Sequence, residues 1–336
     1  TLERRRLSRL SKLSSRLLDE FLKERLVRSL SLDGLKKAAS STTWGVDGSC
    51  QLLKGFDDCW FAFLSAARVY MPEGIYGDII AKVGGWIEPI RTPEDREASK
   101  KATLIMMRME IEQMRNVSRE ADTIAAEKAY LVIDGPIVDP PWLTDENYIA
   151  ERVKVINECL SKGIIVIGFV KRPFGRLFLS YARENIDEHG IIDNYTSDIS
   201  LLSPLMYMAM REKRTKLVMT SPLEMSAANE VSPAYRRYED EGLRVHYCYY
   251  KFGFRRRVYR LEIAGLDDLT EKEILRTFAD AVRTLAGLTP PGVEYPLPVL
   301  LAHNKCNIRR GAAETLYYEI ITRALAQDTT LAWLSL

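Results

Sequence analysis

The chain has 336 residues, of which 46% are hydrophobic and 28% are charged, a composition typical of folded globular proteins. Its formal net charge is only +2, so nucleic-acid binding cannot be inferred from the total charge and would need local basic patches. Five cysteines without a CxxC pair and only three histidines argue against structural zinc, and no apolar run approaches the roughly 20 residues of a transmembrane helix, so we expect a cytoplasmic protein with reduced thiols.

The N-terminal region predicts a basic amphipathic helix over residues 2–30. Its apolar stripe consists of Leu7, Leu10, Leu17, Phe21 and Leu26. Because such a stripe must be covered, we expect residues 1–35 to pack on the rest of the chain or on a second copy. Binding to a membrane surface is the alternative, which the interleaved acids disfavour. Residues 36–336 would form the main domain, with a strand-rich insertion around residues 200–265.

The main domain is predicted to begin with three strands, at about 41–47, 58–70 and 78–90. A long helix over 93–126 follows. The remaining elements are a strand at 129–133, a helix at 143–161, a strand at 164–170, strand-like pieces at 244–252 and 257–263, and helices at 270–286 and 304–326. This order resembles the ribonuclease H-like fold. We therefore predict an α/β protein whose ribonuclease H-like core is a mixed five-stranded sheet flanked by helices, with an N-terminal helix and an inserted strand-rich segment.

Two aspartate-glycine motifs lie in strand-like runs or directly after them, Val46-Asp47-Gly48-Ser49 and Val132-Ile133-Asp134-Gly135-Pro136-Ile137. Asp47 is placed at the end of its strand; the alternative is a hairpin turn, because glycine adopts positive φ readily. Asp134 ends an apolar strand, where α/β sheets gather their functional sites. Buried or half-buried carboxylates are unfavourable without a cation among them, which favours a divalent metal centre and phosphodiester hydrolysis.

The long helix contributes a third acid, Glu110. At about 100° per residue, Glu110 lies in the middle of the apolar face of the helix, whereas Glu112 points nearly the opposite way. We therefore expect Glu110 to face the sheet as a metal ligand and Glu112 to face water. The alternative is a buried glutamate that pairs with an arginine or a lysine.

Two more candidates lie near predicted element ends. His303 follows the stretch Tyr295-Pro296-Leu297-Pro298-Val299-Leu300-Leu301-Ala302 and is placed directly before the last helix, where its imidazole would close the metal centre. A helix cap or a surface histidine is the alternative. Lys171 follows the strand at 164–170, next to the strand that carries Asp134. It would hold a scissile phosphate or orient the attacking water, and a charged strand end in solvent is the alternative.

Local basic patches supply candidate DNA contacts. The run Lys251-Phe252-Gly253-Phe254-Arg255-Arg256-Arg257-Val258-Tyr259-Arg260 interleaves aromatic side chains with arginine, as a DNA-tracking surface requires. A solvated charged face is the alternative for the other basic runs. The candidate DNA contacts are Arg172, Lys251, Arg255, Arg256, Arg257, Arg309 and Arg310.

The last six residues, Leu331-Ala332-Trp333-Leu334-Ser335-Leu336, are too apolar to remain free in water. We expect them to dock on this chain, on a second copy or on a partner protein. The candidate contacts are Leu331, Trp333 and Leu334.

The ordered set of motifs resembles the NurA nucleases over nearly the whole chain. The set comprises VDGS, a long helix with an Arg-Met-Glu segment, VIDGPI, a strand ending in Lys-Arg, and YPLPVLLAHNK, and its order and spacing carry the resemblance. The resemblance implies a homodimeric 5′–3′ exonuclease and single-strand endonuclease with a ribonuclease H-like core, which acts with a HerA-type hexameric ATPase in end resection of DNA double-strand breaks. Position by position, it implies metal ligands and an accessory residue at Asp47, Glu110, Asp134, His303 and Lys171.

We therefore predict a deoxyribonuclease that uses divalent metal, with two ions in each active site. Oxygen ligands suit Mg²⁺ or Mn²⁺, and the imidazole favours Mn²⁺. One alternative is a non-catalytic DNA clamp or scaffold subunit of a translocase, which has no need of buried acids. The other is a sugar-kinase-like ATPase of related fold, whose Gly-rich adenosine motif is missing from the C-terminal third.

Overall fold

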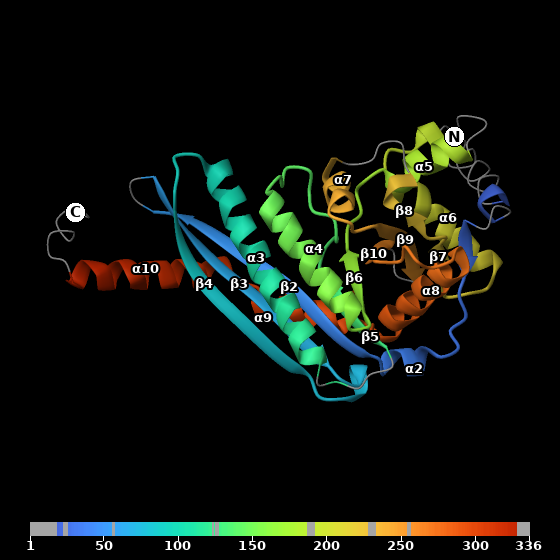
Figure 1. Cartoon of the computed structure of the whole chain (residues 1–336), viewed down its shortest axis with the longest axis horizontal. Helices are drawn as coiled ribbons and strands as arrows, with labels where there is room; N and C mark the ends of the chain where they lie inside the picture. Colours follow the sequence, from blue (N-terminus) through green and yellow to red (C-terminus); the bar gives the residue numbers. More distant parts are fainter. Residues whose placement is uncertain are drawn as a thin grey trace, which may run out of the picture.

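The computed structural model describes residues 19–22, 26–55, 58–122, 124, 128–186, 192–227, 233–253 and 257–327 (Figure 1). Within these ranges the strands are β1 (Val27–Ser29), β2 (Thr42–Lys54), β3 (Cys59–Met71), β4 (Ile80–Arg91), β5 (Ala129–Ile133), β6 (Ile164–Val170), β7 (Leu217–Thr220), β8 (Leu223–Glu224), β9 (Val245–Phe252) and β10 (Tyr259–Ala264). The helices are α2 (Leu35–Ala39), α3 (Asp95–Ala121), α4 (Glu146–Ser161), α5 (Leu177–Asn185), α6 (Asp198–Glu212), α7 (Pro233–Asp240), α8 (Glu271–Gly287), α9 (Leu297–Cys306) and α10 (Arg310–Gln327). No helix within the same ranges is long and apolar enough to cross a membrane.

All of these strands belong to one mixed sheet in the order β1-β7-β9-β10-β6-β5-β2-β3-β4, with β8 paired to β9. β5 runs parallel to both β2 and β6, and the other neighbouring strands are antiparallel. The five predicted core strands lie side by side as β6-β5-β2-β3-β4. A mixed α/β fold is therefore confirmed, but the sheet is twice as large as the five strands predicted, with ten strands among the described residues.

The segment 200–265, predicted as a strand-rich insertion, contributes strands β7 to β10 to this same sheet. β10 pairs directly with β6, and β9 lies between β10 and β7. Side chains of β9 enter the cores on both faces, with Tyr249 in one and Tyr250 in the other. Strands covered on both faces belong inside a sheet, and this explains the density of buried aromatic residues in β9.

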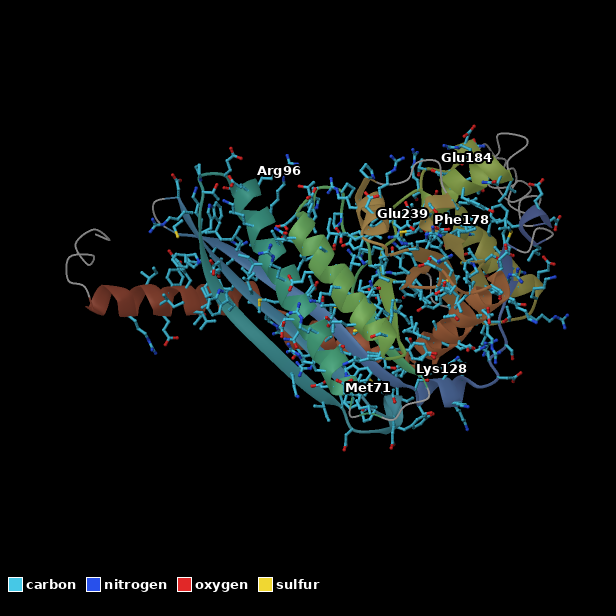
Figure 2. All side chains as sticks on the ribbon, in the orientation of Figure 1. Met71, Arg96, Lys128, Phe178, Glu184 and Glu239 are labelled. Atoms are coloured by element: carbon cyan, nitrogen blue, oxygen red, sulfur yellow. The ribbon has the colours of Figure 1, made fainter. Side chains whose placement is uncertain are left out.

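Helices cover both faces of the sheet, α3 and α4 on one and α8 and α9 on the other (Figure 1). The alternation of side chains along β5 serves these two layers: Leu131 and Ile133 enter the core beneath α3 and α4, while Tyr130 and Val132 enter the core beneath α8. Side chains fill the space between the sheet and the helices (Figure 2). α10 extends away from this body as a separate arm (Figure 1).

The N-terminal region departs from its prediction. Residues 27–29 form β1, which pairs antiparallel with β7, so the predicted helix is wrong at its C-terminal end. The pairing buries the side chain of Val27, which outweighs the helical pattern of the segment. Phe21 is fully buried, and its ring lies 5.8 Å from that of Phe178 in α5. Residues 1–18, with Leu7, Leu10 and Leu17, lie outside the described residues.

The C-terminal region contains two helices where one was predicted. The proline-rich stretch between the helices predicted at 270–286 and 304–326 begins α9, with Pro296 as the N-cap and Pro298 in the first turn. Proline is tolerated there because the first N–H groups of a helix have no partner within it. As a result, His303 lies in the last turn of α9 rather than before the last helix.

Gly45 marks the closest approach of β2 to α9. A Cβ at this position would lie 2.2 Å from the carbonyl oxygen of Pro298, a backbone atom that cannot move aside alone. We therefore expect Gly45→Ala to lower the free energy of unfolding by about 2 kcal/mol or more through overpacking. Denaturant unfolding measures the change. Gly85→Ala in β4, where the nearest atom is 3.8 Å away, is the matched control and should be nearly neutral. Equal losses in the two variants would show that α9 is not held this tightly.

Candidate metal centre

Asp47 lies in the middle of β2, so its prediction at a strand end is wrong and so is the hairpin alternative. The glycine after it serves the close approach of α3. A Cβ on Gly48 would lie 2.7 Å from Oε1 of Glu110 and 2.9 Å from Cγ of Met106. Because side chains alternate along a strand, Asp47 points to the opposite face, toward α9.

Asp134 lies beside Asp47 because the parallel pairing of β2 with β5 continues one residue beyond β5. Ile133 is the register partner of Val46, and the N–H of Asp134 donates to the carbonyl oxygen of Val46 at 2.9 Å. The two aspartates therefore follow a matched pair on adjacent parallel strands. The sequence expectation that both carboxylates meet at one place is met by this backbone contact.

α9 brings His303 to the same place. Its Nδ1 lies 2.7 Å from Oδ2 of Asp47 and 3.8 Å from Oδ2 of Asp134. One ligand atom from each of the three residues lies within 4.8 Å of the other two. Two atoms that share one cation at about 2.1 Å are at most about 4.2 Å apart, and both histidine distances lie within that limit. Asp47, Asp134 and His303 are therefore arranged as a candidate site for one divalent cation.

Lys171 supplies positive charge at the edge of this site. It follows β6, and its Nζ forms an ion pair with Oδ2 of Asp134. The same Nζ lies 4.8 Å from the centroid of the Tyr295 ring, where the ring face attracts a cation. The hydroxyl of Tyr295 accepts a hydrogen bond of 2.8 Å from Arg257, which also pairs with Glu294. The lysine is thus held between a carboxylate and an aromatic ring, with its ammonium beside the candidate cation site.

The negative charge gathered at the site makes ionisation of Asp134 less favourable. Burial and the neighbouring Asp47 raise the pKa of Asp134 to about 6, although Lys171 and His303 act in the opposite direction. Burial and Asp47 also raise the pKa of the Cys306 thiol. A divalent cation would neutralise this concentration of buried negative charge, so the residues present fit a metal centre of oxygen and nitrogen ligands.

Glu110 approaches β2 from the face opposite α9. It is buried, as its helical phase predicts. Burial raises its pKa to about 8; Arg152 opposes this shift, while Asp47, Asp139 and Asp134 add to it. Among the described residues, the group of ligand atoms within 4.8 Å of one another does not include Glu110. The structure therefore brings Glu110 close to the metal centre, over Gly48, but outside the group formed by Asp47, Asp134 and His303.

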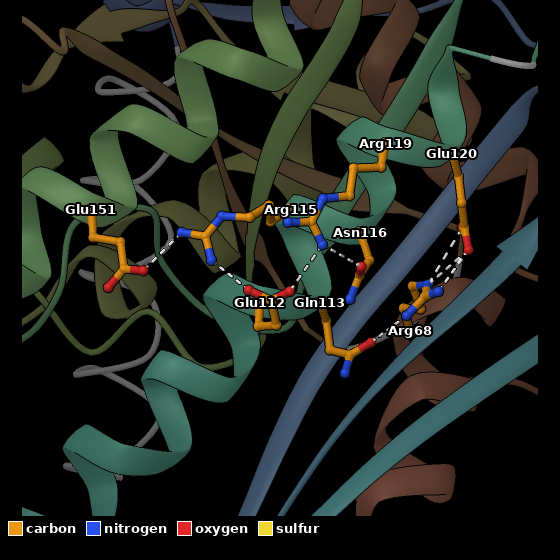
Figure 3. Close-up of polar contacts among 8 residues, drawn as sticks. All are labelled: Arg68, Glu112, Gln113, Arg115, Asn116, Arg119, Glu120 and Glu151. Carbon is orange, nitrogen blue, oxygen red and sulfur yellow. Dashed lines mark hydrogen bonds and ion pairs between the residues drawn. The ribbon is translucent and has the colours of Figure 1, made fainter.

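Glu112 faces away from the sheet, as predicted, and 45% of its side chain is exposed. Figure 3 shows its carboxylate in a network on the outer side of α3. It pairs with Arg115 and, at 3.2 Å, with Arg119, and Arg115 also bridges to Glu151 of α4 at 2.7 Å. The helical phase thus separates the two glutamates correctly.

Two side chains beside the site were not predicted. Cys306 is buried in the last turn of α9, three residues after His303 and therefore on the same side of the helix. Tyr295 contacts Lys171 from the loop before α9. A helix predicted over residues 297–306 would have placed Cys306 beside His303, but the sequence predicted a helix only from residue 304.

Lys251 does not lie on a DNA-accessible surface, so its predicted role is wrong. Its side chain is only 4% exposed in the central strand β9, and burial lowers its pKa. Lys251 and Phe252 end β9, a strand covered on both faces, and Tyr259 and Arg260 begin β10; residues 254–256 between them lie outside the described residues.

The other predicted contacts lie at the surface or outside the described residues. Arg257 is partly exposed and borders the site through Tyr295. Arg172 and Arg309 are exposed, and Arg310 is exposed and pairs with Glu314 at 3.0 Å. The predicted contacts that lie outside the described residues are Arg255, Arg256, Leu331, Trp333 and Leu334.

Comparisons with known proteins identify relatives of this chain. The family model of the NurA domain matches residues 41–308. Among solved structures, the chain is similar to NurA with manganese, at 13% identity over 91% of this chain and 96% of that chain, with a TM-score of 0.47. It is also similar to NurA bound to dAMP and manganese (15% identity, 93% and 94% covered, TM-score 0.40) and to the catalytic domain of human endonuclease V (11% identity, 93% and 98% covered, TM-score 0.39). No curated protein matches.

The raised pKa of Glu110 predicts a stability effect in the metal-free protein. The unfolded chain ionises this group near pH 4.5 and the folded chain near pH 8, so folding loses stability as the pH rises between these values. Glu110→Gln removes the penalty, and we expect its Tm in chelator to exceed that of the wild type by roughly 5 °C or more at pH 8 and to approach it at pH 5.

The matched control is Glu112→Gln, since its partly exposed ion pairs contribute little. Its Tm should follow the wild type at both pH values. A pH-independent difference between Glu110→Gln and the wild type would contradict a buried carboxyl group with a raised pKa at this position.

Proposed function

The chain belongs to the NurA family of nucleases, and from that premise we propose that it is a metal-dependent deoxyribonuclease whose cation is held by Asp47, Asp134 and His303. The observation that carries the proposal is the convergence of these three side chains, from β2, the end of β5 and α9, within 4.8 Å of one another. Mn²⁺ is the preferred ion and Mg²⁺ the alternative, because the set combines carboxylate oxygens with one imidazole.

The residues of the chain divide the work at this site. When bound, the metal would supply an activated water and stabilise the leaving oxygen of the phosphodiester. Asp47 and Asp134 would hold the cation through their carboxylates together with His303, whose Nδ1 lies 2.7 Å from Oδ2 of Asp47. Lys171, paired with Asp134, places an ammonium where a phosphate oxygen would bind and compensates its charge.

Glu110 is proposed as a ligand that would hold a second ion. Its burial over Gly48 and the influence of Asp47 and Asp134 on its pKa support this role. A carboxyl group that burial keeps protonated near neutral pH becomes a ligand once a cation restores its ionised form.

DNA would approach the site from the side where basic residues border it. Arg257 and the exposed Arg172, Arg309 and Arg310 are proposed as phosphate contacts, and Arg255 and Arg256 as contacts outside the described residues. Lys251 is not part of this surface. The strands β6-β5-β2-β3-β4 are proposed as the ribonuclease H-like core of the nuclease.

The remaining parts of the proposal come from the family resemblance. They are a homodimer, 5′–3′ exonuclease and single-strand endonuclease activity, and association with a HerA-type hexameric ATPase in end resection of double-strand breaks. Leu331, Trp333 and Leu334 are proposed as contacts with that partner. A DNA clamp or scaffold subunit is the second candidate; the buried acids disfavour it, because a scaffold gains nothing from them.

Removal of either central carboxylate tests the proposal. We expect Asp47→Ala and Asp134→Ala each to reduce DNA degradation by more than ~100-fold in Mn²⁺ while the metal-free protein keeps its Tm, because each change removes a ligand and relieves repulsion. End-labelled single- and double-stranded DNA with Mn²⁺, Mg²⁺ or chelator provides the assay. Asp280→Asn in α8, an ion-paired surface acid, is the control. Activity of either alanine variant within tenfold of the wild type would refute the assignment.

A further inference from the structure

The loop after Asp134 crosses over β6. Gly168 of β6 is the register partner of Ile133 on one side and of Glu262 in β10 on the other. A Cβ on Gly168 would lie 2.7 Å from the backbone nitrogen of Ile137 and 3.0 Å from the carbonyl oxygen of Gly135. Glycine at this position therefore leaves the space over β6 through which the chain passes directly after the metal centre.

Glu262 in β10 binds this loop on the side of β6 that lies opposite β5. Its carboxylate is fully buried, and its Oε2 accepts hydrogen bonds from the N–H of Ile137 at 2.7 Å and from the N–H of Val138 at 3.4 Å. Its Oε1 pairs with Nη2 of Arg260 at 2.7 Å. An ionised acceptor bonded to backbone N–H groups forms stronger hydrogen bonds than a neutral one, so the loop is held firmly at this point.

A second buried charge holds the same loop from α4. The guanidinium of Arg152 donates from Nη2 to the carbonyl oxygen of Pro136 at 2.9 Å and lies 3.5 Å from Oδ1 of Asp139. Gly135 has a φ of +148°, a conformation that favours glycine. The hydrogen bond from Asp134 N–H to the carbonyl oxygen of Val46 holds the backbone at Asp134 itself, and the contacts of Glu262 and Arg152 hold residues 136–138 directly after it.

We propose that Glu262 is a positioning residue of the metal centre, which sets the direction of the Asp134 carboxylate by holding residues 137 and 138. The inference rests on the proposed function, since it concerns the ligand Asp134. It also explains why the segment 200–265 belongs to the sheet: β10 supports the loop that carries a ligand. Groups that orient metal ligands without touching the metal typically contribute 10–100-fold to metal affinity.

The experiment measures Mn²⁺ binding to the full-length protein by calorimetry, together with backbone hydrogen exchange of the metal-free protein. Glu262→Gln keeps the shape of the side chain but removes its charge and the pair with Arg260. We expect it to weaken Mn²⁺ binding about 10–100-fold and to speed exchange in residues 134–140. Gly168→Ala perturbs the same loop from β6, and we expect the same two effects from it.

The matched control is Asp198→Asn. Asp198 is also a fully buried acid that accepts a backbone N–H, but that N–H belongs to Leu179 in α5. This variant should lose stability without losing Mn²⁺ affinity. If Glu262→Gln and Gly168→Ala bind Mn²⁺ like the wild type, or no more weakly than Asp198→Asn, the positioning role is refuted.

Two other outcomes are also decisive. If Glu262→Gln fails to fold by circular dichroism, Gly168→Ala carries the test alone, with the same expected loss. If the wild type itself binds no Mn²⁺ while Asp134→Ala matches it, the proposed metal centre fails, and the positioning role fails with it. A failure of the positioning role alone leaves the wild type binding Mn²⁺ and Asp134→Ala unable to do so.

Discussion

The parallel pairing of β5 between β2 and β6 is the constraint on which the arrangement of the site depends. Strands that run in one direction bring their carboxyl ends to the same edge of the sheet. β5 and β6 end at this edge while β2 continues past it, which leaves Asp134 beside Asp47 and Lys171 beside Asp134. α9 and α3 then add their side chains to residues whose positions the strand pairing has already determined.

Two glycines allow helices to reach β2 from both faces near Asp47. Gly45 lies against the backbone of α9, and Gly48 lies against Glu110 and Met106 of α3. A side chain at either position would move away the helix that carries His303 or Glu110. These two glycines therefore set how closely α9 and α3 approach β2. Asp47 and His303 lie on one face of this strand, and Glu110 lies on the other.

The sequence predicted those features that depend on local pattern. The phase of α3, which buries Glu110 and exposes Glu112, follows from helical geometry alone. β5 and β6 follow from short apolar runs, the first followed by Asp134 and the second preceded by Gly163 and followed by Lys171. The convergence of Asp47, Asp134, Lys171 and His303 was also expected. Asp134 and Lys171 lie directly after their strands as predicted, whereas Asp47 and His303 occupy other positions within their elements than predicted.

The missed features depend on distant parts of the chain. For Gly48 the sequence suggested only a hairpin turn, as the alternative to a strand end, because the close approach of α3 to this position cannot be seen without the fold. The sequence likewise does not show that Lys251 is buried within the sheet. Nor does it show that Glu262 accepts a hydrogen bond from the N–H of Ile137, 125 positions earlier. A run of alternating aromatic and charged residues cannot show whether one or both faces of its strand are covered.

His303 and Asp47 touch although 256 positions separate them in the chain. During synthesis, which proceeds at about 5–20 residues per second, the two aspartates exist for many seconds before α9 emerges. A nascent chain that ends before α9 therefore contains the two carboxylates without the imidazole. The strand that carries Glu262, β10, is synthesised after Asp134 and before α9. All strands of the described sheet precede α9 in the chain, so His303 joins the two aspartates only after the sheet that positions them has been synthesised.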